Sequence, residues 1–250
     1  FKEVPNLEGL QLCPQTKVER LVQLFQDHSF QNELTVWIHL VNNIQPLLMP
    51  LLEQHQFPVP HHWASCGLSL LQQNSGSSLG NFYSSPFRLK LEISIQLLEA
   101  ALKFSQGVEG FAFYITDMTA DNLVYNIQEN KLYFVDLDSL FIADSRSYNS
   151  RDIQKHQFMQ CPNCFAYSPQ ELCSQAQSDI NLFLACQLLR EDLQQQRQGG
   201  FLYPIPPTVL QSHSQLEELL QECVYCSDSQ CKNRFAASFK LIELFKQILQ

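Results

Sequence analysis

The segment from 114 to 140, YITDMTADNLVYNIQENKLYFVDLDSL, places four aspartates between hydrophobic runs. Three of them, Asp117, Asp136 and Asp138, directly adjoin residues whose pattern predicts buried strands. Burying a charge costs several kcal/mol unless another group pairs with it. A metal ion or a reacting group that pairs with these carboxylates is the most economical explanation. The segment is therefore the first candidate for a functional site.

Composition limits the classes of protein that this chain can represent. With 250 residues, 45% of them hydrophobic, it can bury a sizeable core as one domain or as two packed lobes. The 16 basic residues against 25 acidic ones give a net charge of −9, which excludes a general nucleic-acid binder. No apolar run approaches the roughly 18 residues that a membrane span needs. Because the chain opens on Phe1 without a signal-peptide pattern, we expect a fragment or processed product, with which an upstream anchor or signal is compatible.

Nine cysteines are many for a cytosolic protein of this size, and two interpretations compete. The pairs CPNC and CVYC have the C-x-x-C spacing of a zinc knuckle, but they lie much further apart than the roughly 15–20 residues of a compact zinc ribbon. Disulfides in a secretory protein account for more of the cysteines and leave one unpaired, so they are favoured over zinc and over free buried thiols. The candidate disulfide cysteines are Cys13, Cys66, Cys161, Cys164, Cys173, Cys186, Cys223, Cys226 and Cys231.

Hydrophobic periodicity predicts a mixed α+β chain. The predicted helices cover 16–25, 33–55 (kinked or ended by its two prolines), 86–105, 178–193, 214–222 and 233–249. An extended hairpin is predicted to turn at Gly67, and short strands are predicted within 110–115, 124–127 and 131–137, with a hairpin tip at 128–130. Residues 145–178 are predicted to be irregular. The polar Gly/Ser-rich stretch 74–81 is the clearest boundary.

The order of elements around the aspartates is typical of a kinase catalytic region. A buried helix and a strand precede Asp117, Asn122 follows in D-x-x-x-x-N spacing, and a hairpin then leads to Asp136. In such a region the first Asp positions the acceptor hydroxyl, while the Asn and the second Asp hold Mg²⁺ through oxygen atoms. Asp179 opens an apolar helix that would support this loop from beneath. Asp138 and Asp121 are weaker candidates for additional metal ligands.

On these motifs the chain resembles the divergent protein kinase domain family, in the branch named for deleted in autism. Further matching stretches are LCP at 12–14, SCG at 65–67, TADNLVYN, VDLDSLFIAD, the helix region between Cys173 and Cys186, and RFAASFKLIELF. The resemblance implies a protein-kinase-like α+β fold, mainly the helical C-lobe (74–250) with an incomplete N-lobe (1–73). It also implies structural disulfides and a location in the Golgi, in the endoplasmic reticulum lumen or outside the cell.

The same resemblance implies roles for individual residues. Asp117 would be catalytic, Asn122 and Asp136 would hold Mg²⁺ or Mn²⁺ with ATP, and Asp179 would support the loop. The substrate would be a protein hydroxyl, on a protein that the sequence does not identify. The alternative is a pseudokinase that acts as a secreted or luminal binding module.

Several departures from ordinary kinases favour that alternative. The His-Arg pair before the catalytic Asp is Ile115-Thr116, and Asp-Phe-Gly is replaced by Asp136-Leu137-Asp138. No G-x-G-x-x-G loop occurs among the eight glycines, and no V-A-I-K-like lysine is present. Family members carry that strand and lysine upstream, so we expect the ATP site of this chain to be incomplete.

Overall fold

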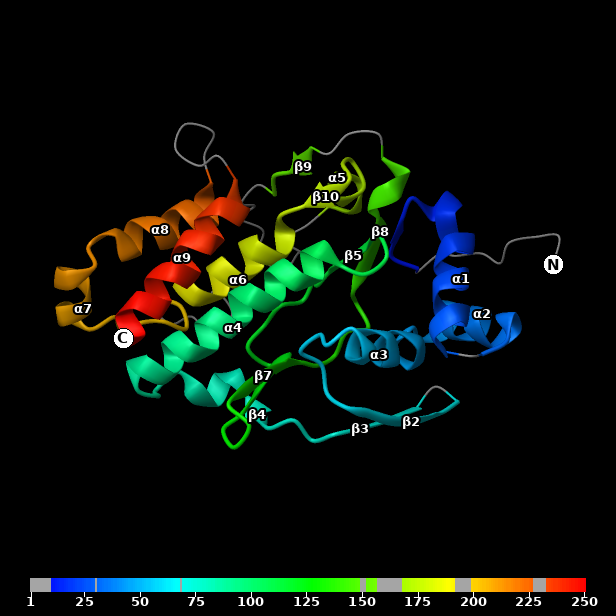
Figure 1. Cartoon of the computed structure of the whole chain (residues 1–250), viewed down its shortest axis with the longest axis horizontal. Helices are drawn as coiled ribbons and strands as arrows, with labels where there is room; N and C mark the ends of the chain where they lie inside the picture. Colours follow the sequence, from blue (N-terminus) through cyan, green and yellow to red (C-terminus); the bar gives the residue numbers. More distant parts are fainter. Residues whose placement is uncertain are drawn as a thin grey trace.

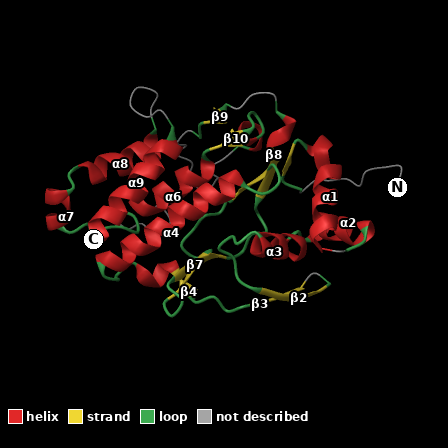
Figure 2. Ribbon diagram, in the orientation of Figure 1, coloured by secondary structure: helices red, strands yellow, loops and turns green. Residues whose placement is uncertain are grey.

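The computed structural model describes residues 10–29, 31–67, 69–148, 152–156, 168–191, 199–226 and 233–250 (Figure 1). Helices gather at the C-terminal end of the molecule, and short strands run through its middle beside a second, smaller group of N-terminal helices (Figure 2). The mixed α+β architecture expected from the sequence is confirmed.

A long buried helix forms the axis of the larger helical group. Helix α4, Phe87–Gln106, packs against α6, α9, β5 and β7. Because it is covered on most faces, its sequence shows apolar residues at both strand-like and helix-like spacings. Its buried hydroxyls are satisfied within the helix, since Ser94 and Ser105 donate to the carbonyls of Lys90 (2.6 Å) and Ala101 (2.9 Å). The helix predicted over 86–105 is confirmed.

The other C-terminal helices are α5 Pro169–Leu172, α6 Ile180–Arg190, α7 Pro207–Ser212, α8 Gln215–Tyr225 and α9 Arg234–Leu249. Helix α6 packs against α8 and α9, and α8 against α9, so these three form one bundle with α4. The sequence predicted α6, α8 and α9 but not the short helix α7. None of the described helices is both long and apolar enough to cross a membrane.

Two three-stranded sheets flank the candidate site. The first has the order β1-β8-β5, with β1 Leu12–Cys13, β8 Phe141–Asp144 and β5 Phe111–Tyr114. The second has the order β4-β6-β7, with β4 Ser77–Ser78, β6 Leu123–Asn126 and β7 Lys131–Phe134. Strand β1 is parallel to β8, whereas β5 pairs with β8 and β6 with β7 antiparallel. The loops from β5 to β6 and from β7 to β8 therefore run between the same two sheets.

The N-terminal part is helical and ends in the predicted hairpin. Its elements are η1 Gln15–Lys17, α1 Val18–Ser29, α2 Glu33–Asn42, α3 Gln45–Gln54, β2 His62–Cys66 and β3 Ser69–Gln72. The helix predicted over 33–55, kinked or ended by its prolines, is divided into α2 and α3, and the break precedes Pro46. Pro46 is the second residue of α3, in the first turn, where its missing N–H costs no helix hydrogen bond, and Pro50 is accommodated inside the helix.

The loop predicted over 74–81 contains structure. It holds β4, which pairs with β6, and the turn η2 Leu79–Phe82. Gly76 has a φ of 121°, and a Cβ there would lie 2.3 Å from the carbonyl oxygen of Tyr125. Only glycine permits this approach of the two strands. The region after 144, predicted irregular, contains η3 Ser145–Ser147 and the parallel pair β9 Ile153–Gln154 and β10 Gln177–Ser178.

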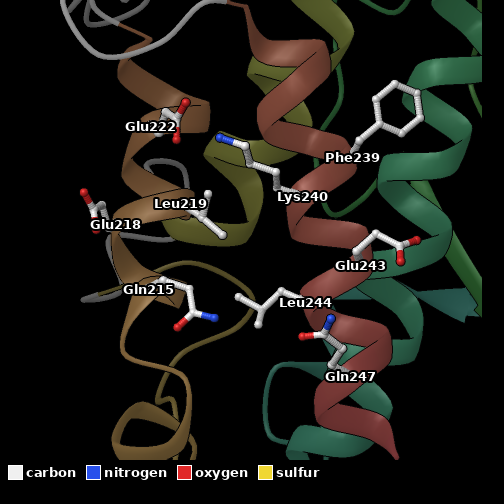
Figure 3. A pocket seen from close by; sticks show the side chains of 9 residues that line it. All are labelled: Gln215, Glu218, Leu219, Glu222, Phe239, Lys240, Glu243, Leu244 and Gln247. Carbon is white, nitrogen blue, oxygen red and sulfur yellow. The ribbon is translucent and has the colours of Figure 1, made fainter.

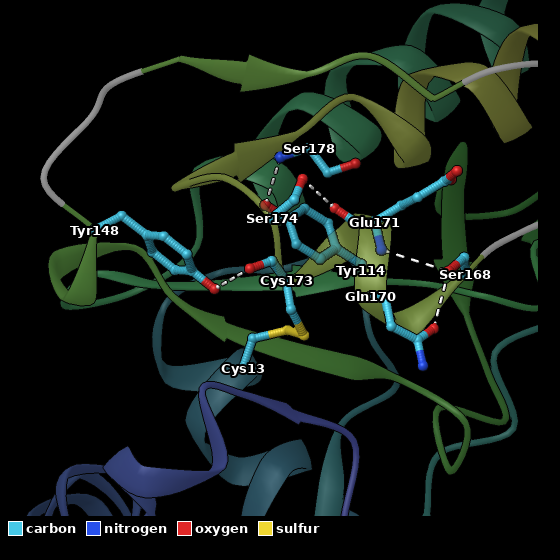
Figure 4. Close-up of a disulfide and its surroundings, with 9 residues drawn as sticks. All are labelled: Cys13, Tyr114, Tyr148, Ser168, Gln170, Glu171, Cys173, Ser174 and Ser178. Atoms are coloured by element: carbon cyan, nitrogen blue, oxygen red, sulfur yellow. Dashed lines mark hydrogen bonds between the residues drawn. A yellow bond between two sulfur atoms is a disulfide. The ribbon is translucent and has the colours of Figure 1, made fainter.

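Two disulfides tie distant parts of the chain together. Cys13 bonds Cys173 across 160 positions (Figure 4), and Cys186 bonds Cys223, which joins α6 to α8. Cys226 is also disulfide-bonded, so the Cys223 and Cys226 pair does not hold zinc. Cys66 is an exposed free thiol, so its inclusion among the candidate disulfide cysteines was wrong. The remaining candidates, Cys161, Cys164 and Cys231, lie outside the described residues.

The proposed division at residues 73 and 74 stays a prediction. Strand β1 and Cys13 nevertheless fix the first segment to β8 and to Cys173 of the second.

Replacing both Cys13 and Cys173 by serine is expected to lower the free energy of unfolding by about 5 kcal/mol, because the bond closes a loop of 160 positions. Urea unfolding followed by tryptophan fluorescence measures the change. Cys66→Ser is the matched control and should shift it by less than about 0.5 kcal/mol. A double variant within about 1 kcal/mol of the parent would contradict this role.

Candidate active site

The two loops that carry the predicted site residues, between β5 and β6 and between β7 and β8, are joined by hydrogen bonds. The amide of Val135 donates to the carbonyl of Asn122 at 3.0 Å, and the Thr116 hydroxyl donates to the carbonyl of Ser139 at 2.7 Å. Thr116 stands where ordinary kinases have the arginine before the catalytic Asp. Its hydroxyl thus provides a direct connection between the two loops. The loop that carries Asp117 and Asn122 therefore lies beside the loop that carries Asp136.

Asp117 and Asn122 form a bonded pair. The Asn122 Nδ2 donates to Asp117 Oδ2 at 2.9 Å and to the Asp117 carbonyl at 3.1 Å. The backbone between them turns back on itself, because Thr119 N donates to Asp117 O and Asn122 N to Thr119 O. The five-residue spacing is the length that this turn requires. With Nδ2 occupied, Asn122 Oδ1 accepts no hydrogen bond from the described residues and is available to a cation.

Asp136 stands at the exposed end of the second loop. It has a φ of 56°, in the left-handed region that Asp enters more readily than most residues. Partial burial raises the pKa of its carboxyl, and the negative charges of Asp138 and Asp117 raise it further. The two neighbouring charges show that the fold brings all three carboxylates into one electrostatic neighbourhood. Between Asp136 and Asp138, Leu137 is buried in the core and anchors the segment.

The electrostatics of this cluster favour a cation. Among the described residues, none of the carboxylates Asp117, Asp136 and Asp138 takes part in an ion pair. Nor do the three bring their oxygens within 4.8 Å of one another as a closed cage. Mg²⁺ in phosphoryl-transfer sites is typically held by one or two carboxylates together with substrate phosphates. The donor set of Asp136, Asn122 and Asp117 fits a cation of that kind. Asp121 is exposed, lies 3.4 Å from the Ser78 hydroxyl, and is less suited.

Asp179 is buried, and its carboxylate is hydrogen-bonded to residues outside the loop that carries Asp117. Its Oδ1 accepts from the amide of His156 at 2.7 Å, and its Oδ2 accepts from Arg234 at 2.8 Å. Burial raises the pKa of Asp179, while the charge of Arg234 opposes that rise. Asp179 makes no hydrogen bond to the described segment 115–122. The supporting role assigned to Asp179 from the sequence therefore stays a prediction.

Asn181, two residues after Asp179, is hydrogen-bonded to the backbone just before the loop of Asp117. Its Oδ1 accepts from the amide of Ile115 at 2.9 Å, and its Nδ2 donates to the Phe113 carbonyl (2.8 Å) and the Ser105 hydroxyl (3.0 Å). It is fully buried, and the other buried residues of α6 are apolar. A lone asparagine inside the run INLFLACQLL was the available signal, because a buried amide needs partners.

Comparison with known families matches residues 36–225 to the "Protein-kinase domain of FAM69". The chain belongs to this family. The matched range contains Asp117, Asn122, Asp136 and Asn181, so the geometry above lies within the kinase-domain match. No solved structure matches the chain.

Curated relatives agree with this family. The human protein named "Divergent protein kinase domain 2A" is 24% identical over 259 residues, covering 94% of this chain and 60% of that protein. The Xenopus tropicalis protein of the same name is 25% identical over 220 residues, covering 84% of this chain and 51% of that protein. The mouse protein is 24% identical over 234 residues, covering 84% and 54%. The chain thus spans about half to three-fifths of the length of the relatives it matches.

Strand β5, which leads into the loop that carries Asp117, makes further side-chain contacts. Beyond the Asn181 contacts, the Tyr114 hydroxyl accepts from the amide of Ser178 at 2.7 Å, and burial raises the pKa of Tyr114 (Figure 4). Tyr148 donates to the carbonyl of the disulfide-bonded Cys173 at 2.8 Å. The contacts of Tyr114 and Tyr148 both lie near the Cys13–Cys173 disulfide (Figure 4).

A groove of about 620 Å³ lies elsewhere, between α8 and α9 (Figure 3). It is open, and Glu218, Glu222, Lys240 and Glu243 surround it with mixed charge. None of its lining residues comes from the segment 114–140, so it is separate from the carboxylate cluster.

Asn181→Ala is expected to lower the free energy of unfolding by about 2–4 kcal/mol, because it leaves the buried Ile115 amide and Phe113 carbonyl without a partner. Urea unfolding measures the loss, and faster hydrogen exchange at the Ile115 amide locates it. Asn42→Ala, on the exposed face of α2, is the control and should change stability by less than about 0.5 kcal/mol. Equal losses in both variants would contradict the anchoring role.

Proposed function

We propose that this chain carries the catalytic loops of an atypical protein kinase, which transfers a phosphoryl group from ATP to a protein hydroxyl with Mg²⁺ or Mn²⁺. The observation that carries the proposal is the neighbourhood of Asp117, Asn122 and Asp136. They lie in two adjacent loops, and the carboxylates take part in no ion pair of the described residues. An unneutralised cluster of this composition favours a divalent cation.

Each residue has a distinct role in this proposal. Asp117 accepts a hydrogen bond from the acceptor hydroxyl and orients it, while its bond to Asn122 fixes the carboxylate. Asn122 Oδ1 and Asp136 hold the cation, whose charge would neutralise the phosphate oxygens. Asn181 positions the loop through the backbone. Catalysis of this type depends mainly on positioning and charge, so small displacements of the loop matter.

The disulfides support a location in the secretory pathway, in the Golgi or endoplasmic reticulum lumen, or outside the cell. Disulfides such as Cys13–Cys173 and Cys186–Cys223 persist in oxidising compartments and are rare in the cytosol. The protein substrate would then be a luminal or secreted protein.

A pseudokinase that serves as a luminal binding module is the second candidate. It is favoured by the Thr116 hydroxyl, which joins the two loops where an arginine would otherwise read a phosphate. Asp138 adds a further negative charge where ordinary kinases have a flexible glycine. Both substitutions are consistent with loops held in one arrangement.

The test uses the full-length natural protein, with ATP labelled in the γ-phosphate, Mn²⁺, and casein as a general hydroxyl acceptor. Asp117→Asn is expected to lower kcat at least about 100-fold, because the general base is lost. Asp121→Asn, an exposed carboxylate of the same loop, is the matched control and should retain activity. Transfer that survives in Asp117→Asn would disprove the role of Asp117. Absence of transfer from the natural protein, with Mn²⁺-ATP still binding, would select the pseudokinase.

A further inference from the structure

A second cluster of metal-ligating side chains lies away from the catalytic loops, where three elements meet. His28 comes from the last turn of α1, His55 from the C-terminal cap of α3, and Glu109 from the turn between α4 and β5. One ligand atom from each of them lies within 4.8 Å of the other two. No other trio of His, Cys, Asp and Glu in the part of the chain described here meets that condition.

Both ring nitrogens of His28 face acceptor oxygens, so Nε2 must hold either a proton or a metal ion. Its Nδ1 lies 3.0 Å from Gln54 Oε1, an acceptor, so Nδ1 carries the proton in that contact. Its Nε2 lies 2.9 Å from Glu109 Oε1, which is also an acceptor. A neutral ring would set two lone pairs against each other there. The contact is favourable only when a proton or a metal ion lies between Nε2 and the carboxylate.

His55 supplies the third ligand. Its Nε2 is buried and has no hydrogen-bond partner. The imidazole rings of His28 and His55 lie edge to face, with centroids 5.3 Å apart and an interplanar angle of 68°. A buried ring nitrogen without a partner costs free energy, which coordination would recover.

The three ligands are held by rigid backbone. His55 is fixed by its amide, which donates to the Leu51 carbonyl at 3.2 Å. The turn carrying Glu109 is closed by paired bonds between Val108 and Phe111 at 2.7 and 2.8 Å, and Glu109 itself has a left-handed φ of 51°. The hydrogen bond between His28 Nδ1 and Gln54 Oε1 orients the imidazole ring. Metal-bound histidines are commonly oriented in this way by a hydrogen bond at the nitrogen that does not hold the metal.

We propose that His28, His55 and Glu109 bind a zinc ion that joins α1 and α3 to the turn before β5. Two imidazoles and one carboxylate form a ligand set of known zinc sites, with a fourth position left for water. Tetrahedral coordination would widen the contact between His28 Nε2 and Glu109 Oε1 from 2.9 Å to about 3.3 Å. The Glu109 side chain is 53% exposed, which gives the ion a path from solvent.

The test uses the folded chain in a Cys66→Ser background, which removes the exposed thiol. After treatment with a chelator, the chain is titrated with Zn²⁺ by calorimetry, in excess Mg²⁺ so that oxygen-ligand sites are occupied. We expect one equivalent to bind. At a free Zn²⁺ concentration 100 times the dissociation constant of the site, the thermal unfolding midpoint of the chain should rise by about 5–10 °C. Co²⁺ in its place should give the intense visible absorption of a four-coordinate site.

Variants separate this site from other binding. Glu109→Gln and His55→Ala should each abolish one-equivalent binding, while Gln54→Ala should weaken it about 10-fold. His61→Gln is the matched control, because His61 also contacts a glutamate, Glu53, but belongs to no such trio. Asp136→Asn should leave Zn²⁺ binding unchanged. Absence of one-equivalent binding to the parent, or its persistence in Glu109→Gln and His55→Ala, would overturn the proposal.

Discussion

The arrangement of the site depends on one buried amide. Asn181 connects α6 to α4 through Ser105, and to the end of β5 through the Phe113 carbonyl and the Ile115 amide. No other side chain of the described residues bonds both of those backbone groups. The side-chain amide can donate and accept at once, which a carboxylate in the same place could not do. The start of the loop that carries Asp117 is thereby held against the helical core.

From that anchor the charges of the site follow. The loop out of β5 places Asp117 beside Asn122, and the bonds to Asn122 and Thr116 bring the second loop alongside it. Partial burial raises the pKa of Asp136, and the neighbouring carboxylates Asp138 and Asp117 raise it further. A fold selected for stability alone would place cations against these charges, as it does for Asp179 with Arg234. Among the described residues, Asp179 has an ion-pair partner, whereas Asp117, Asp136 and Asp138 have none, and the proposed cation site rests on this contrast.

Local patterns in the sequence predicted the elements that local chemistry determines. The long helix α4, the hairpin turning at Gly67 and the D-x-x-x-x-N pair were predicted because periodicity and spacing encode them. The parallel pairing of β1 with β8 could not be predicted, because each strand is short and the partners are distant. The contacts of Asn181 were not predicted, because an aspartate that opens a helix is a stronger sequence pattern than a single buried amide. The cluster of His28, His55 and Glu109 comes from three elements, and only their packing brings it together.

The most direct test of the account is thermal unfolding of the full-length protein with and without Mn²⁺-ATP, beside Asp136→Asn and the control Asp121→Asn. Binding at 100 times the dissociation constant adds about 2.7 kcal/mol to the free energy of unfolding. The account predicts a rise in the midpoint that Asp121→Asn retains and Asp136→Asn loses, beyond any effect of Mn²⁺ alone. No rise with Mn²⁺-ATP, or a rise that persists in Asp136→Asn, would contradict a metal–nucleotide site on the two loops.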